Sequence, residues 1–173
     1  MGETRLERGR YNMNKYMQIA DELSKQNLLT NNGGPFGAVV VKDGVVVGTG
    51  NNHVLRNNDP TAHGEITAIR NACKELNTYD LSGCELYTSC YPCPMCLSAT
   101  IWANIKTIYY GNTQLDAADI GFRDDFIYNY IDDICENEDH KENNDILKLI
   151  PMDREETIKT FKEFKEKEDK TIY

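Results

Sequence analysis

The chain has 173 residues, of which 40% are hydrophobic and 27% charged, which suits one globular domain with a sizeable core. The chain contains nineteen basic and twenty-eight acidic residues. The resulting net charge of −9 argues against a nucleic-acid partner, whose phosphates need basic groups. The N-terminus is rich in charge and neither end carries a long apolar run, so we expect a cytoplasmic protein with reduced cysteines and no membrane partner.

The first predicted elements are a helix and a β-hairpin. Apolar residues recur at helical spacing over residues 13–23, which predicts an amphipathic helix that ends before residues 31–34. Two valine-rich runs, 36–41 and 45–47, flank Asp-Gly at 43–44, a dipeptide typical of hairpin turns. Because the valines do not alternate with polar residues, we expect helices on both faces of these strands.

The second strand is followed by a polar loop and then by a helix that carries His63 and Glu65. Thr61 is a good N-cap residue, and apolar residues follow it at helical spacing. The pattern therefore predicts that His63 lies in the first turn of an amphipathic helix, with Glu65 beside it.

A third predicted strand, residues 85–89, leads into the run Pro-Cys-Pro-Met-Cys at 92–96. Proline is tolerated in the first turn of a helix, so this run predicts a loop that turns into a helix with Cys93 and Cys96 near its start. Their spacing places both sulfurs on one face, and the positive end of the helix favours thiolates. A fourth strand, residues 107–110, would run parallel to the third if the helix between them is a right-handed crossover.

The last third of the chain has weaker patterns. We expect, in order, a helix over 124–134, a mobile acidic loop over 136–145, a short strand over 146–150 and a helix that begins at Asp153. Glu156 would complete a capping box with Asp153. Taken together, the elements predict an α/β fold, a three-layer α/β/α sandwich with a central mixed sheet.

His63, Cys93 and Cys96 together predict a catalytic zinc site. They supply three protein ligands, and zinc prefers four, so the fourth position is left for a water molecule whose pKa zinc lowers toward neutrality. The spacing H-x-E followed by P-C-x-x-C is the signature of zinc-dependent nucleobase deaminases. In such a reaction Glu65 can carry a proton from that water to a nitrogen of the base and then help ammonia leave.

Three further side chains are candidates for contact with a nucleobase. Asn52, at the end of the second strand, can donate and accept hydrogen bonds with a ring edge. Phe36 and Trp102 could supply flat apolar walls, although core packing suits Trp102 equally well.

Two alternatives stay open. A purely structural zinc site would form if Cys90, three residues before Cys93, completed the coordination shell, but such a site has no use for Glu65. The chain could also be a non-catalytic, zinc-stabilised binding module, against which Glu65 is again the main argument.

The chain resembles the cytidine and deoxycytidylate deaminase superfamily at Pro-Phe-Gly-Ala-Val (35–39), Asn-Asp-Pro-Thr-Ala-His (58–63) and Tyr-Thr-Ser-Cys (87–90). Within it, residues 116–128 are similar to the bacterial guanine deaminase branch. The resemblance implies zinc-dependent deamination of guanine to xanthine and ammonia. The residues it implies for this reaction are His63, Cys93 and Cys96 on Zn²⁺, Glu65 as proton shuttle, and Asn52, Asp124 and Tyr173 around the purine.

The resemblance leaves other activities open. They are those of cytosine deaminase, of another purine or nucleoside deaminase and, disfavoured by the charge, of tRNA adenosine deaminase.

Residues 1–135 would form the deaminase domain, and residues 136–173 a C-terminal segment of the same domain. This segment carries an apolar stripe of Ile158, Phe161 and Phe164, and it either docks on its own body or exchanges within a homodimer, where Tyr173 would close the partner's purine pocket.

Overall fold

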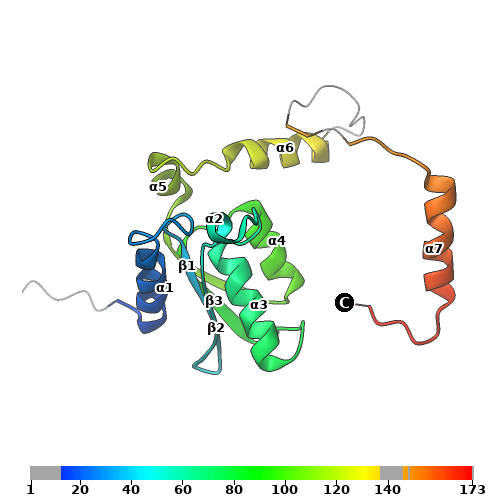
Figure 1. The fold of residues 1–173 in the computed structure, drawn as a ribbon. Coiled ribbons are helices and arrows are strands. Elements are labelled where there is room, and N and C mark those ends of the chain that lie inside the picture. The colour runs from blue at the N-terminus through cyan, green and yellow to red at the C-terminus, as the bar shows by residue number, and fades with distance from the viewer. Residues whose placement is uncertain (1–12, 137–145, 148, 173) are drawn as a thin grey trace, which may run out of the picture. The chain divides into compact units, whose positions relative to one another are not determined.

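The computed structural model describes residues 13–136, 146–147 and 149–172. The chain divides into two compact units, one that ends at Asp125 and one that begins at Phe126. The first unit is built on a four-stranded mixed sheet with helices on both faces (Figure 1). Its strands are β1 (Gly37–Lys42), β2 (Val45–Asn51), β3 (Cys84–Cys90) and β4 (Thr107–Asn112). Its helices are α1 (Lys15–Gln26), α2 (Val54–Asn57), α3 (Gly64–Leu76), α4 (Pro94–Trp102) and α5 (Gln114–Asp119).

The strands are arranged in the order β2-β1-β3-β4. β1 and β2 form the predicted antiparallel hairpin, and φ is positive at both Asp43 and Gly44, as a type I′ turn requires. β3 pairs antiparallel with β1 and parallel with β4, so α4 is the predicted crossover between them. The prediction of a mixed sheet is therefore confirmed.

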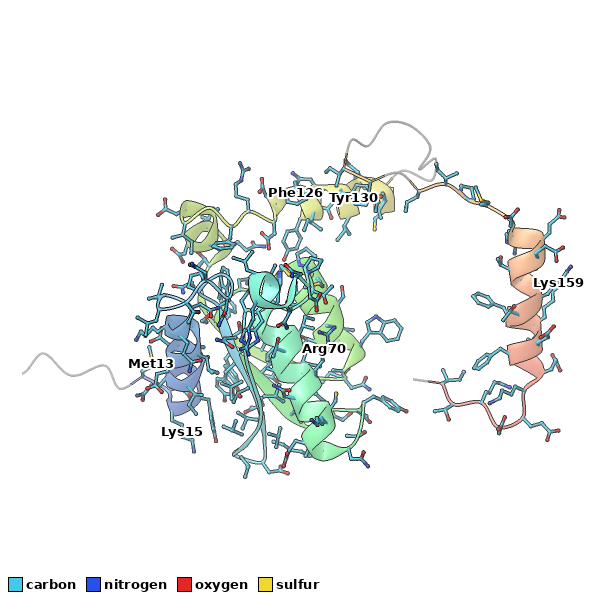
Figure 2. All side chains as sticks on the ribbon, viewed as in Figure 1. Met13, Lys15, Arg70, Phe126, Tyr130 and Lys159 are labelled. Carbon is cyan, nitrogen blue, oxygen red and sulfur yellow. The ribbon has the colours of Figure 1, made fainter. Side chains whose placement is uncertain are left out.

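The core lies on both faces of the sheet, as the valine-rich strands predict. Val39 and Val41 face α1, whereas the alternate residues Ala38 and Val40 face α3. Arg70 is exposed on the outward side of α3 (Figure 2), so this helix is buried on one face only. The three layers of the predicted sandwich are thus α1, the sheet, and α3 with α4.

The N-cap of α3 lies two residues after the predicted one. It is His63, and the first helical residue is Gly64. Thr61 does not cap the helix, because its hydroxyl and its backbone N–H both donate to Oδ1 of Asp59, at 2.7 and 2.8 Å. The prediction of Thr61 as N-cap is wrong, and His63 lies just before the first turn instead of within it.

The described residues of the second unit form two helices, α6 (Asp125–Glu136), whose first residue still belongs to the first unit, and α7 (Arg154–Glu166). Figure 2 labels Phe126 and Tyr130 on α6 and Lys159 on α7. Both helices are predicted from the sequence. None of the helices in the described part of the chain is long and apolar enough to cross a membrane.

Two local predictions for this unit are wrong. Asp153 has a φ of 51° and its side chain makes no capping hydrogen bond, while Glu156 pairs with Lys159 instead, so no capping box forms. The described residues of the stretch 146–150 belong to no strand, and the sheet pairs none of them. The predicted loop over 136–145 lies outside the described residues, apart from Glu136, which ends α6.

Candidate metal centre

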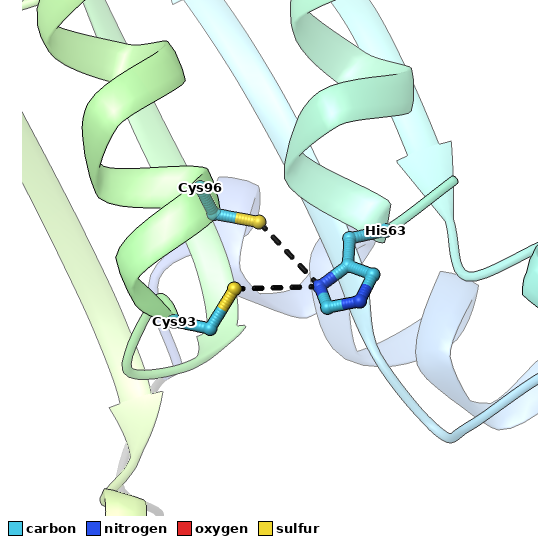
Figure 3. Close-up of side chains that lie close together, drawn as sticks. All are labelled: His63, Cys93 and Cys96. Carbon is cyan, nitrogen blue, oxygen red and sulfur yellow. Dashed lines mark hydrogen bonds between the residues drawn. The ribbon is translucent and has the colours of Figure 1, made fainter. Parts of the chain in front are cut away.

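Three side chains of the kinds that bind metals meet where the N-termini of α3 and α4 lie close together (Figure 3). His63 is the N-cap of α3, Cys93 is the N-cap of α4, and Cys96 lies in the first turn of α4. Nδ1 of His63 lies 3.6 Å from Sγ of Cys93 and 3.6 Å from Sγ of Cys96. Pro94 is the first residue of α4, as the sequence predicts, and it fixes the backbone from which both thiols project.

The donor set fits a tetrahedral zinc ion. Bonds of about 2.3 Å to sulfur and about 2.05 Å to nitrogen, at a tetrahedral angle, separate the two donor atoms by roughly 3.6 Å. His63 lies at this distance from both sulfurs. Among the described residues Cys90 does not join the donor group, because its thiol points to the backbone oxygen of Thr113 at 3.5 Å. Three protein donors leave the fourth position of zinc open to water.

The two thiols and the imidazole shift one another's pKa values. The hydrogen bond with Cys96, together with the neighbouring imidazole of His63, lowers the pKa of Cys93 to about 4. The same pairing, with burial, raises the pKa of Cys96. The hydrogen bond with Cys93 raises the pKa of His63. Because a bound cation favours the deprotonated form of every donor, metal binding would release the protons that the two thiols and the imidazole still carry.

Glu65 lies beside the metal donors, in the first turn of α3. Its side chain is buried, with Oε2 at 3.5 Å from Sγ of Cys96. Oε1 accepts a hydrogen bond of 3.1 Å from the hydroxyl of Thr88 on β3. Burial raises the pKa of the Glu65 carboxyl. A carboxyl fixed in this place can take a proton next to the metal and return it.

Asp124 lies in the segment that follows α5, and the charges of two metal donors act on its carboxyl. Burial raises the pKa of its carboxyl, the thiolate of Cys93 raises it further, and the imidazole of His63 opposes the shift. The structure therefore brings Asp124 within electrostatic reach of two metal donors, in a partly buried position.

An aromatic pair joins the Asp124 segment to the loop before β1. The rings of Phe36 and Phe122 meet edge to face, with centroids 4.9 Å apart and planes at 86°. Gly34 lies against both rings, and a Cβ at this position would lie 2.7 Å from a carbon of each. Because Phe122 is two residues before Asp124, this pair links the segment that carries Asp124 to the loop that carries Phe36.

Asn52 is buried directly after β2, next to the backbone of Phe36. Its N–H donates to the backbone oxygen of Phe36 at 2.9 Å, and its Oδ1 accepts from the N–H of Val54 at 3.1 Å. A Cβ on Gly33 would lie 2.1 Å from that Oδ1, so only glycine leaves room for the Asn52 side chain. Asn52 and Phe36 thus lie on two segments that are held directly together.

The remaining predicted contacts are not brought to this group within the described chain. Trp102 is the last residue of α4, about 13 Å along the helix axis from Cys93 at ~1.5 Å per residue, and it is 67% exposed. Tyr173 lies outside the described residues.

Three residues whose contacts join parts of this site are not predicted from the sequence. They are Thr88, Phe122 and Asn27, whose side chain donates to the backbone oxygens of Gly34 and Asn52. Thr88 could have been found from strand alternation, because it lies on the same face of β3 as Leu86, which packs toward α3. The contacts of Asn27 and Phe122 join segments that are distant in sequence, and no local pattern marks them.

Comparison with known proteins agrees with this geometry. Residues 10–112 match the family model of the cytidine and deoxycytidylate deaminase zinc-binding region. Guanine deaminase of Bacillus subtilis is 51% identical over 121 residues, which are 70% of this chain and 78% of the relative. The X-ray structure of guanine deaminase from Bacillus subtilis matches 93% of this chain and 99% of its own, with a TM-score of 0.81 and 41% identity. A tRNA-specific adenosine deaminase of Aquifex aeolicus is 43% identical over 76 residues, 44% of this chain and 50% of the relative.

Proposed function

The chain belongs to the cytidine and deoxycytidylate deaminase family, and from this premise we propose that it hydrolyses guanine to xanthine and ammonia with zinc as cofactor. The observation that carries the proposal is the joint occurrence of two features. One is a three-donor zinc site with a buried carboxyl beside it. The other is a likeness to guanine deaminase that extends over nearly the whole chain.

The chemistry follows from the positions of the side chains. When bound, zinc lowers the pKa of a water molecule at its fourth position and makes a nucleophile available near neutral pH. Glu65 would take a proton from the attacking water as the water oxygen bonds to C2 of guanine, and would deliver the proton to the adjacent ring nitrogen. Glu65 then carries the second proton of the water to the amino group, so that the carbon–nitrogen bond breaks, ammonia leaves and the new carbonyl of xanthine remains.

The purine would be held on the side of the site formed by Asn52 and Phe36. The amide of Asn52 can meet the polar edge of the ring, and the ring of Phe36, supported by Phe122, offers a flat wall. Asp124, whose raised pKa reflects burial next to Cys93, would act as a second acid–base group near the amino group that leaves.

The proposal extends to a homodimer in which residues 136–173, a C-terminal segment of the deaminase domain formed by residues 1–135, are exchanged. α7 supports this extension, since Phe161 is 74% exposed and Phe164 is also exposed. An exposed apolar stripe on a helix is stabilised when it packs against another surface, which a second subunit could provide. In the dimer Tyr173 would cover the base bound to the neighbouring subunit.

We place the reaction in the cytoplasm. Zinc binding needs Cys93 and Cys96 as free thiolates, and reducing compartments preserve them in that form.

A substrate panel tests the proposed function. Zinc-loaded protein should release ammonia from guanine and release little from cytosine, cytidine, adenine or guanosine. The same protein treated with a chelator is the control for metal dependence. Preference for cytosine or another base would refute guanine as the substrate and leave the zinc-dependent deaminase chemistry intact. No ammonia from any base would favour a non-catalytic binding module.

A tRNA substrate is the less favoured alternative. The likeness to the tRNA-specific adenosine deaminase of Aquifex aeolicus covers 44% of this chain, against 70% for the guanine deaminase of Bacillus subtilis, and the formal charge of −9 opposes binding to a polyanion. Deamination of tRNA with an affinity that falls steeply as salt rises would overturn this conclusion.

A further inference from the structure

The side chain of Asn27 closes a ring of hydrogen bonds behind the proposed purine contacts. Its Nδ2 donates to the backbone oxygen of Gly34 at 2.7 Å and to the backbone oxygen of Asn52 at 2.8 Å. The N–H of Phe36 donates to the same oxygen of Gly34, at 2.9 Å, and the N–H of Asn52 donates to the oxygen of Phe36, also at 2.9 Å. Asn27 thereby joins the loop before β1 to the end of β2.

An amide is the side chain that this position needs. Both N–H groups of the Asn27 amide are used by the two carbonyl oxygens, and its Oδ1 accepts from Nδ2 of Asn51 at 3.3 Å. The residue is 6% exposed, so water does not replace these bonds easily. Asn27 is also the C-cap of α1, which ties the ring to a helix packed on the sheet.

The residues that Asn27 holds are those on the substrate side of the site. The ring fixes the backbone of Asn52 and of Phe36, and it fixes Gly34, against which the rings of Phe36 and Phe122 pack. Among its described hydrogen bonds, none goes to His63, Cys93, Cys96 or Glu65. A defect at Asn27 would therefore disturb the place where the base binds and spare the metal and its proton carrier.

We propose that Asn27 is a positioning residue for the substrate, which sets the separation between the amide of Asn52 and the ring of Phe36 and thereby the affinity for the purine. This inference rests on the proposed deamination of guanine. It predicts that loss of the Asn27 amide weakens ground-state and transition-state binding together, which raises KM and leaves kcat nearly unchanged.

The test compares zinc-loaded wild-type protein with Asn27→Leu, which removes all three hydrogen bonds, and Asn27→Asp, which keeps the size and the acceptor but loses the donors. Asn71→Leu is the control. Nδ2 of Asn71 donates to the backbone oxygen of Thr49 in β2, at 2.8 Å, so this variant also loses a bond from an amide to the backbone, but outside the ring of hydrogen bonds that Asn27 closes. For each protein kcat and KM for guanine, zinc content and the thermal unfolding midpoint are measured.

The expected result is a KM about tenfold higher or more in both Asn27 variants, with kcat within roughly threefold and zinc content unchanged. Asn71→Leu should keep both constants. A folded Asn27 variant with the wild-type KM overturns the inference, and so does a fall in kcat with loss of zinc, which indicates a general structural role. If Asn27→Leu does not fold, Asn27→Asp decides; if neither folds, Asn27 is a folding residue and the inference is wrong. An inactive wild-type chain would refute the proposed function itself, a result separate from all of these.

Discussion

The hydroxyl of Thr88 on β3 donates a hydrogen bond of 3.1 Å to Oε1 of Glu65, and both side chains are almost completely buried. The bond leaves Oε2 turned toward Sγ of Cys96, at 3.5 Å. Thr88→Val keeps the shape of the side chain and removes the donor, so the carboxyl loses its fixed orientation. We expect kcat for guanine to fall roughly tenfold, the scale of one hydrogen bond to a charged group, while KM and zinc content stay unchanged.

The control for this prediction is Ser24→Ala, which removes another buried hydroxyl, bonded to the backbone oxygen of Asp21 at 2.8 Å in α1. Steady-state kinetics and metal analysis are needed for both variants. A Thr88→Val protein with wild-type kcat would show that Glu65 is oriented by its helix alone.

Glu65 is the residue on which the catalytic interpretation depends most. Glu65→Gln keeps the size of the side chain and can still accept the hydrogen bond from Thr88, but it cannot carry a proton. Turnover of guanine should fall by about 10²–10⁴-fold, with zinc content and the thermal midpoint close to those of the wild type. Unchanged turnover would contradict the proton-carrier role and favour a site in which the metal has no catalytic partner.

The zinc ligands can be separated from the nearby cysteine by metal analysis. His63→Ala, Cys93→Ala and Cys96→Ala should each lose the single zinc ion per chain, because each removes one of three protein donors. Cys90→Ala should keep the ion, since the thiol of Cys90 is bonded to the backbone of Thr113 and burial raises its pKa to about 11. Loss of zinc from Cys90→Ala would indicate a closed, structural site with four protein ligands.

The aromatic pair of Phe36 and Phe122 predicts a remote effect on Asp124. Phe122→Ala removes the ring that holds the segment after α5 against Phe36, so Asp124 should lose its fixed approach to the site. We expect kcat/KM for guanine to fall at least tenfold, whereas Phe122→Leu, which keeps apolar bulk, should lose less. Leu115→Ala, an 81% exposed position on neighbouring α5, is the control and should change little. Equal activity of all three variants would mean that Asp124 is placed by other contacts.

Elements whose determinants are local could be predicted from the sequence. Asp-Gly at 43–44 specifies the hairpin turn, and Pro94 specifies the start of α4. The N-cap of α3 could not be predicted in this way, because Thr61 is a good N-cap by type but its hydroxyl is taken by Asp59. The capping box forms elsewhere, at Thr113 and Asp116 of α5. That helix is only six residues long, too short for its periodicity to be recognised.

The residues of the site also fall into those with local determinants and those that depend on tertiary contacts. Residues fixed by chemistry and spacing, His63, Cys93 and Cys96, could be predicted, because few residue types bind zinc. Residues that act through tertiary contacts could not: Asn27 bonds to Asn52, 25 positions away. Trp102, placed near the base by residue type, lies at the far end of α4, since helix geometry separates the two ends of that element.

The C-terminal segment gives the last prediction. α7 leaves Phe161 and Phe164 exposed, and an apolar stripe of this kind is stabilised by burial against a second surface. A chain truncated after Lys170 should keep its zinc site in the first unit but lose Tyr173, which would cover the base. Its KM for guanine should rise or its kcat should fall, with full zinc content.

Complementation shows from which subunit the covering residue comes. The truncated chain has an intact Glu65 and no Tyr173, whereas full-length Glu65→Gln has Tyr173 and no proton carrier. If Tyr173 closes the site of the partner, mixing the two chains under conditions that exchange subunits should restore part of the activity, because each mixed dimer contains one complete site. Mixing the truncated chain with truncated Glu65→Gln is the control and should restore none. Mixed dimers that form, as shown by a size or affinity tag, but remain inactive would contradict exchange of the C-terminal segment.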